Sequence, residues 1–198
     1  MRKIFLDCGG NLGRAVRGFT KAYPDSAEYE IFSFEPQTRL VKFYDGIIHP
    51  YLHVVNKAVW THDGFVEFHY TKNVKGSTCF ADYAADEGIV KSTKVPCIGL
   101  SAWITNSFDV DDYIVVKMNI EGAEYPILEQ IVDDGTSTYI NELYVSPHVS
   151  KVDSISKQRA TTLLTKLKAH GIEPTWPPPW GHVRPQKYPF DQIGPPQR

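Results

Sequence analysis

The sequence has no long apolar run. After Met1-Arg2-Lys3, only Ile4-Phe5-Leu6 precede Asp7, which is far short of the apolar stretch of a secretion signal. No later run approaches the roughly 18 apolar residues that a membrane-spanning helix needs. We therefore expect a cytoplasmic protein with no membrane partner.

Cysteine and histidine patterns typical of other protein classes are also missing. The three cysteines are an odd number and include no C-x-x-C pair, which favours a reducing compartment over a disulfide framework. The sequence has no H-E-x-x-H motif, and His49, His62 and His69 lack the close spacing of metal ligands. We predict no metal site.

An excess of positive charge is absent as well. Lys and Arg number 21 against 23 Asp and Glu, so the formal net charge is -2. Such a chain has no overall basic field that would hold a polyanion, and the charge balance does not favour a nucleic-acid partner.

What the chain does have is an alternation of strand-like and helix-like segments, which is typical of an α/β fold with a mostly parallel, doubly wound sheet. Its 198 residues are enough for one core. We expect one domain over residues 1–175, with an irregular insertion at 71–94. The Pro-rich tail, 176–198, carries four aromatic residues and is expected to pack on or near the domain.

The apolar patterns predict the individual elements. Strands are expected at 4–6, 30–34, 52–55, 95–98, 113–118 and 140–145, and helices near 12–23, 38–44, 101–106, 123–132 and 160–167. Pro36 is expected in the first turn of the second helix. Asp63-Gly64 predicts an antiparallel hairpin between 58–60 and 65–70.

The strongest motif is Phe5-Leu6-Asp7-Cys8-Gly9-Gly10-Asn11-Leu12-Gly13, a strand that ends in an acid and continues through a glycine-rich turn into a helix. Glycines allow a ligand to approach the backbone, and a helix N-terminus offers free N–H groups. An acid at this point suits an ammonium group better than a pyrophosphate, and the glycine spacing is not G-x-G-x-x-G, so the motif argues against NAD. A turn that needs glycine only for tight strand-helix packing remains the alternative.

Two further strands end in polar residues. Ile31-Phe32-Ser33-Phe34-Glu35 places a carboxylate where α/β nucleotide-binding folds hold ribose hydroxyls. The apolar strand 113–118 is followed by Asn119-Ile120-Glu121-Gly122-Ala123-Glu124. Because ligands of open α/β sheets lie at the carboxyl ends of the strands, we expect these groups at one crevice.

Together these segments resemble the FkbM-type family of S-adenosylmethionine-dependent methyltransferases. Residues 117–124 are similar to the family's K-I-D-V-E-G-A-E, residues 7–13 to D-x-G-A-N-x-G, Phe34-Glu35-Pro36 to F-E-P, and Asn56-Lys57-Ala58-Val59 to N-x-A-V. The four motifs occur in the family's order. The resemblance implies a Rossmann-like class I methyltransferase fold, S-adenosylmethionine as methyl donor, and O-methylation of a small molecule or sugar hydroxyl, hence a small-molecule or glycan acceptor.

The resemblance also implies a place for each motif around the cofactor. Asp7, Gly9, Gly10, Asn11 and Gly13 would surround the methionine portion, Glu35 with Pro36 the ribose, and Asn56, Lys57 and Ala58 the adenine. Asn119 and Glu121 would face the sulfonium. Asn119 departs from the family, which usually carries Asp there, and so removes a negative charge near the transferred methyl group.

Methyl transfer also needs a base for the proton of the acceptor. Glu121, Glu124 and His148 are the candidates, with Glu121 preferred. Glu124 has an alternative role as a carboxylate that favours the start of a helix, and His148 as a loop residue without function. The insertion, nearest the cofactor at Gly76-Ser77-Thr78, and the tail are expected to form the acceptor site.

Two other functions stay open. One is a non-catalytic binding module that keeps the fold but has lost transfer through changes such as Asn119. The other is a nucleic-acid methyltransferase, which the charge balance does not favour. Pro177-Pro178-Pro179-Trp180 resembles an element of adenine amino-methyltransferases but lies in the tail rather than after the fourth strand.

Overall fold

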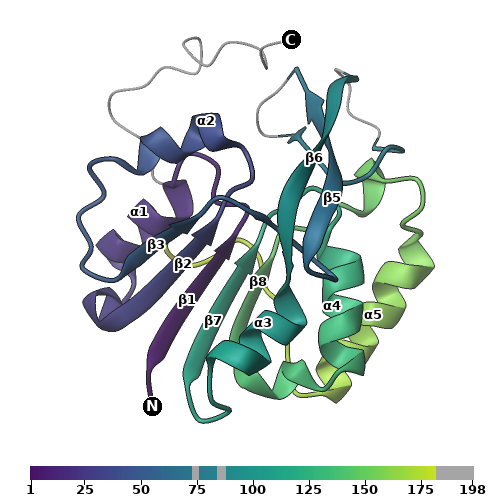
Figure 1. Ribbon diagram of the computed structural model, residues 1–198. Coiled ribbons are helices and arrows are strands. Elements are labelled where there is room, and N and C mark those ends of the chain that lie inside the picture. Colours follow the sequence, from purple (N-terminus) through teal and green to yellow (C-terminus); the bar gives the residue numbers. More distant parts are fainter. Residues whose placement is uncertain (73–75, 84–87, 182–198) are drawn as a thin grey trace.

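The computed structural model describes residues 1–72, 76–83 and 88–181, and a five-stranded parallel sheet lies at its centre (Figure 1). The strand order is β3-β2-β1-β7-β8. These strands are β1 (Lys3–Cys8), β2 (Tyr29–Phe34), β3 (Leu52–Val55), β7 (Tyr113–Met118) and β8 (Ile140–Val145). The predicted limits of the last three are confirmed.

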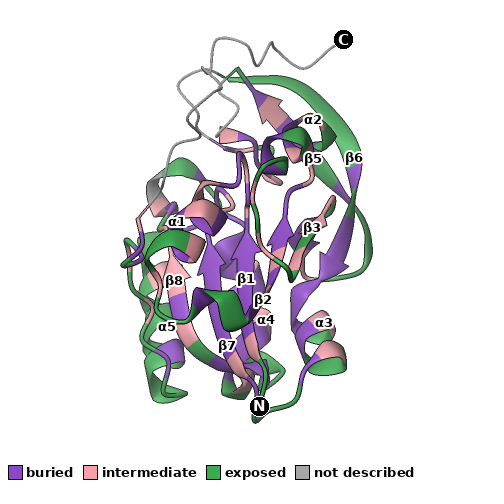
Figure 2. Cartoon of the chain, turned by 90° about the vertical axis from the view of Figure 1, so that its left-hand side faces the viewer, coloured by how far each residue is buried: buried purple, intermediate pink, exposed green. Residues whose placement is uncertain are grey.

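Helices cover both faces of this sheet. Helix α1 (Arg14–Ala22) packs on one face, where the Phe19 ring stacks on that of Phe5 with centroids 4.1 Å apart. Helices α3 (Leu100–Ser107), α4 (Glu124–Asp133) and α5 (Lys157–Ala169) cover the other face. The central strands are buried on both sides (Figure 2). Full burial of one such side chain stabilises the fold by about 1.5–3 kcal/mol.

This arrangement confirms the predicted α/β class with a mostly parallel sheet and is compatible with a Rossmann-like fold. The chain passes from β1 to β2 and β3 on one side, and β7 and β8 lie on the other. The strand order therefore reverses between β1 and β7. In open α/β sheets this reversal creates a crevice at the carboxyl ends of the two strands, where ligands bind.

The predicted hairpin between residues 58–60 and 65–70 is wrong. Strand β4 (Ala58–Trp60) and β5 (Gly64–Thr71) belong to a second sheet of order β4-β6-β5, in which β6 (Ile89–Gly99) separates them. Cys97 of β6 pairs with Ala58 on one side, in parallel, and with Gly64 on the other, antiparallel. Residues 61–63 thus carry the chain across β6 instead of closing a tight turn.

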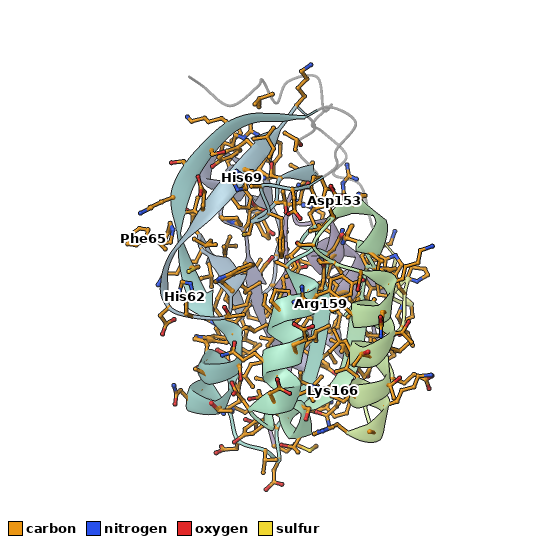
Figure 3. The ribbon with its side chains drawn as sticks, turned by 90° about the vertical axis from the view of Figure 1, so that its right-hand side faces the viewer. His62, Phe65, His69, Asp153, Arg159 and Lys166 are labelled. Atoms are coloured by element: carbon orange, nitrogen blue, oxygen red, sulfur yellow. The ribbon has the colours of Figure 1, made fainter. Side chains whose placement is uncertain are left out.

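The insertion is also shorter than predicted, because β5 runs to Thr71 and β6 begins at Ile89, well before residue 95. Phe65 of β5 lies at the outer side of the second sheet (Figure 3). His69 lies four residues after Phe65 on β5 and so on the same face of the strand, but it is buried. The backbone of Thr78 pairs with that of His69, and the His69 ring contacts Ser92. Residues 73–75 and 84–87 of the insertion lie outside the described residues.

The second predicted helix also differs. It consists of a single turn, α2 (Thr38–Val41), followed by a 3₁₀ turn (Lys42–Tyr44). Pro36 precedes the helix instead of lying in its first turn, because Gln37 still has an extended backbone, with ψ of 96°. Further 3₁₀ turns lie at Ser26–Glu28, Thr136–Tyr139 and Val149–Lys151.

The beginning of the tail packs on the α1 face of the sheet. Trp180 is 6% exposed, and its ring meets those of Phe5 and Phe19 edge to face at 5.4 and 5.2 Å. A Cβ atom on Gly18 would lie 2.8 Å from the carbonyl oxygen of Gly181, so α1 needs a glycine where the tail crosses it. Residues 182–198, including the other tail aromatics Tyr188 and Phe190, lie outside the described residues.

No helix within the described residues is long and apolar enough to cross a membrane. The same residues contain no cluster of three or more His, Cys, Asp or Glu side chains that could hold a metal ion.

Candidate functional site

Two turns meet at the point where the strand order reverses, and we call them the β1 turn (residues 9–13) and the β7 turn (residues 119–123). In the β1 turn, Gly9, Asn11 and Gly13 have left-handed backbones, with φ of 82°, 49° and 69°. A Cβ atom on Gly9 would collide with the Asn119 carbonyl, so the two turns touch backbone to backbone. A Cβ atom on Gly10 would collide with the hydroxyls of Ser33 and Tyr44. Contacts within the chain therefore already require both glycines.

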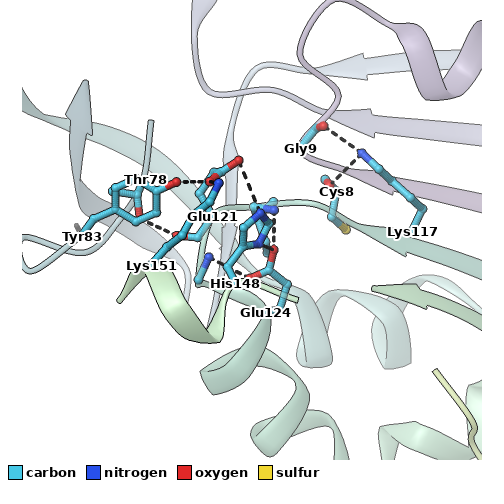
Figure 4. Close-up of polar contacts among 11 residues, drawn as sticks. Cys8, Gly9, Thr78, Tyr83, Lys117, Glu121, Glu124, His148 and Lys151 are labelled. Atoms are coloured by element: carbon cyan, nitrogen blue, oxygen red, sulfur yellow. Dashed lines mark hydrogen bonds and ion pairs between the residues drawn. The ribbon is translucent and has the colours of Figure 1, made fainter. Parts of the chain in front are cut away.

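Asp7, at the start of the β1 turn, is fully buried and paired inside the chain. Its Oδ1 accepts from Lys117 Nζ at 2.8 Å, and its Oδ2 accepts from Ser33 Oγ at 2.8 Å. Lys117 also donates to the Gly9 carbonyl at 3.0 Å and approaches that of Cys8 at 3.5 Å (Figure 4). The Asp7 carboxylate thus has a cation of its own, and its direct contact with a ligand ammonium stays a prediction.

Glu35 follows β2 and reaches the β1 turn. It is 3% exposed, and its two oxygens accept from the backbone N–H groups of Asn11 and Gln37, each at 2.8 Å. Burial raises the pKa of the Glu35 carboxyl to about 7, although the two backbone hydrogen bonds act in the opposite direction. A carboxylate has about four lone-pair sites, so two remain for hydroxyl donors of a ligand.

The N-x-A-V segment lies beside Glu35. Asn56 Nδ2 donates to the Glu35 carbonyl at 2.7 Å, and Thr38 Oγ1 donates to Asn56 Oδ1 at 2.7 Å. Asn56 thereby ties the end of β3 to the end of β2. Lys57 is exposed and Ala58 is buried in β4. The structure brings Asn56 to the Glu35 group, with Lys57 at the surface next to it.

Glu124 shapes the β7 turn. Its Oε1 accepts from the Ile120 backbone N–H at 2.7 Å and its Oε2 from that of Gly122 at 2.8 Å. It is 1% exposed, and it lies in the first turn of α4, where a negative charge is favourable. The Glu124 carboxylate is thus used inside the chain to hold a turn in which Glu121 and Gly122 have φ of 53° and 106°.

His148 lies between two carboxylates. Its Nδ1 is 2.9 Å from Glu124 Oε1 and its Nε2 is 3.5 Å from Glu121 Oε1 (Figure 4). Burial alone would lower the pKa of His148, but the hydrogen bond to Glu124 and the negative charges of both glutamates outweigh burial and raise this pKa above its ordinary value. The predicted base candidates therefore form one cluster, with His148 as its centre.

Glu121 is the member of this cluster with the most varied partners. Its Oε2 accepts from Lys151 Nζ at 3.1 Å and from the Tyr83 hydroxyl, and its backbone carbonyl accepts from Thr78 Oγ1 at 2.7 Å. The insertion thus reaches the β7 turn through Thr78, in the segment expected to approach it. Ser77 is 8% exposed, and its buried Oγ has no hydrogen-bond partner within the described chain.

Asn119 begins the β7 turn and is half-buried. Its backbone N–H donates to the Cys8 carbonyl at 3.1 Å, which joins the ends of β1 and β7. Its carboxamide makes no hydrogen bond within residues 1–72, 76–83 and 88–181. An unpaired amide is thus present where the two strands diverge.

Sequence reasoning missed three residues of the site as functional candidates. Lys117 had a signal, since a lysine inside the apolar run of β7 needs a buried anion. No sequence pattern indicated Tyr83 and Lys151, because they lie 38 and 30 residues from Glu121, the residue that they contact.

A scan against protein-family models, a search of curated proteins and a search of solved structures find no match to this chain.

Proposed function

We propose that this chain is a methyltransferase that uses S-adenosylmethionine to methylate a hydroxyl oxygen of a small molecule or sugar. The observation that carries the proposal is Glu35: a buried carboxylate with two free acceptor positions, held against the β1 turn beside the reversal of strand order. A ribose offers two neighbouring hydroxyl donors to such a carboxylate. The motif resemblance adds the class I methyltransferase fold and the identity of the donor.

The residues present fit S-adenosylmethionine, and only Asp7 has a role other than the expected one. Glu35 accepts from the ribose hydroxyls, and Asn56 and Lys57 lie beside it toward the adenine. Asp7 acts through Lys117, which holds the Cys8 and Gly9 carbonyls and so fixes the β1 turn. Asn119, whose carboxamide is unpaired within the described chain, offers a donor and an acceptor to the methionine portion.

S-adenosylmethionine supplies an electrophilic methyl group when it is bound, so the chain has to align the acceptor oxygen and remove its proton. Glu121 takes this proton, since it lies at the crevice and is bordered by Lys151 and His148. Glu124 and His148 are positioning residues, because Glu124 holds the β7 turn and His148 links it to Glu121. Ser77, with its unpartnered hydroxyl, orients the acceptor.

The first test is titration calorimetry with S-adenosylhomocysteine, beside NAD and ATP. We expect selective binding of S-adenosylhomocysteine by the wild-type chain and at least about tenfold weaker binding by Glu35→Gln, since the variant loses a charged acceptor. Glu30→Gln is the matched control, because Glu30 lies on β2, the strand that Glu35 follows, and contacts the exposed His53 instead. It should bind like the wild type.

Absence of binding in a chain that unfolds cooperatively would overturn the proposal, as would equal binding of NAD. Binding without methyl transfer to any hydroxyl acceptor, and no gain of transfer in Asn119→Asp, would favour the non-catalytic binding module.

A further inference from the structure

A pocket lies at the amino ends of the central strands, on the opposite side of the sheet from the β1 and β7 turns. Its volume is about 590 Å³, and Lys3, Tyr29 and Tyr113, which line it, are the first residues of β1, β2 and β7. Because the strands are parallel, this edge carries their amino ends, whereas the β1 and β7 turns follow the carboxyl ends. The proposed methyltransferase chemistry uses no residue of this pocket.

A single carboxylate, Glu142 of β8, organises the pocket. Its Oε1 accepts from Tyr113 at 2.6 Å and from the Tyr23 hydroxyl, and its Oε2 accepts from Tyr144 at 2.6 Å. Burial raises the pKa of Glu142, but the three phenol hydrogen bonds outweigh burial and lower it below its ordinary value. Three of about four lone-pair sites are occupied, so one is left for a further donor.

Aromatic rings stand at steep angles to one another around this carboxylate. The Trp180 ring meets Tyr23 at 5.4 Å and 80°, and Tyr144 at 4.8 Å and 73°. Tyr29 meets Tyr23 at 5.6 Å and 89°. Ring faces attract cations, and several faces that enclose one space bind alkylated ammonium groups.

Of the charged side chains that line the pocket, Asp25 and Glu142 are acidic and Lys3 is basic. Lys3 pairs with Asp25 and Glu28, which leaves Glu142 without an ion-pair partner in the described chain. Helix α1 ends at Ala22, another lining residue, and the C-terminal end of a helix favours positive charge. A half-buried carboxylate without a cation thus faces an aromatic pocket.

We propose that this pocket binds a small organic ammonium ion, with Glu142 as its counter-ion and the rings of Tyr23, Tyr144 and Trp180 as its walls. The central strands separate this site, at their amino ends, from the crevice at their carboxyl ends. The ion therefore binds independently of S-adenosylmethionine.

The test is calorimetric titration of the full chain with choline and, separately, with its uncharged tert-butyl analogue, at matched ionic strength. We expect choline to bind and the analogue to bind at least about tenfold more weakly, because only the cation gains from the carboxylate and the ring faces. This comparison uses the wild-type chain and does not depend on how a variant folds.

Variants locate the site. Glu142→Gln should weaken choline binding by at least about tenfold, since it removes the counter-ion. Glu173→Gln is the control variant. It removes a carboxylate whose ion-pair partner is Lys168, and it should leave choline binding unchanged. Tyr113→Phe keeps its ring and frees one lone pair of Glu142, so it should still bind choline. Equal binding of the two ligands, or wild-type binding by a folded Glu142→Gln, would overturn the proposal.

Discussion

The β1 turn and the β7 turn touch each other, yet the chain holds them by different means. The β1 turn depends on the buried ion pair of Lys117 and Asp7, which are 2% and 0% exposed. The β7 turn depends on Glu124, which accepts backbone N–H groups, while Glu121 and the half-exposed Lys151 form an ion pair beside it. Breaking a buried pair is costly, whereas a pair with one half-exposed partner, as at Lys151, contributes less to stability. The difference separates residues that hold the site from residues that can act in it.

The largest expected effect is on the pair that holds the β1 turn. Lys117→Met leaves the Asp7 carboxylate buried without a cation, and we expect the free energy of unfolding to fall by about 3–5 kcal/mol. Lys151→Met, at the partly exposed pair of the β7 turn, should lower it by about 1 kcal/mol or less. Denaturant unfolding of both variants measures the contrast.

The double variant Asp7→Asn with Lys117→Met is the control for this interpretation. It should recover part of the loss, because no uncompensated charge remains buried. Equal losses in Lys117→Met and Lys151→Met would remove the distinction between the two turns.

The next effect is a pH dependence at Glu35, which braces the β1 turn. Its pKa is raised in the folded chain from 4.5 to about 7, so the folded state binds the proton more tightly than the unfolded state. The contribution of Glu35 to stability is therefore fully present below pH 4.5 and falls by about 3 kcal/mol as the pH rises to about 7. Urea unfolding across this range measures the slope, and Glu35→Gln should lose this part of it while Glu30→Gln keeps it.

The smallest effects on stability are expected for substitutions at the β7 turn, and they differ between Glu121 and Glu124. Glu124→Gln disrupts a carboxylate with three donors and should cost about 1–3 kcal/mol. Glu121→Gln should cost about 1 kcal/mol or less, since its lysine partner is half-exposed.

Methyl transfer provides the second readout for this pair. It should fall by about 10²–10⁴-fold in Glu121→Gln, the usual contribution of a positioned base. If Glu121→Gln lost stability but kept its transfer rate, Glu121 would be a structural residue like Glu124.

Local patterns predicted the central sheet well. Strands β3, β7 and β8 begin and end at the predicted residues, because turn residues bound each apolar run. The acids and amides after β1, β2 and β7 could be found for the same reason. Each follows a strand whose end the sequence marks.

Contacts between distant segments could not be predicted. Asp63-Gly64 has the local signature of a hairpin, but β6, about 30 residues further on, takes the place between its two arms. Asp7 and Lys117 are 110 residues apart, so local patterns did not reveal that the Asp7 carboxylate forms a buried ion pair with Lys117. The cluster of His148 with Glu124 likewise depends on how a loop after β8 folds back onto α4.

The burial of Trp180 under α1 has a consequence for synthesis on the ribosome. Phe5 belongs to β1, which lacks one neighbouring strand until β7 is made, and its side chain lacks one neighbouring ring until residue 180 has left the exit tunnel. The apolar surface around Phe5 and Phe19 therefore stays partly uncovered on the nascent chain until Trp180 has been made. During that interval it offers an exposed aromatic segment of the kind that chaperones bind.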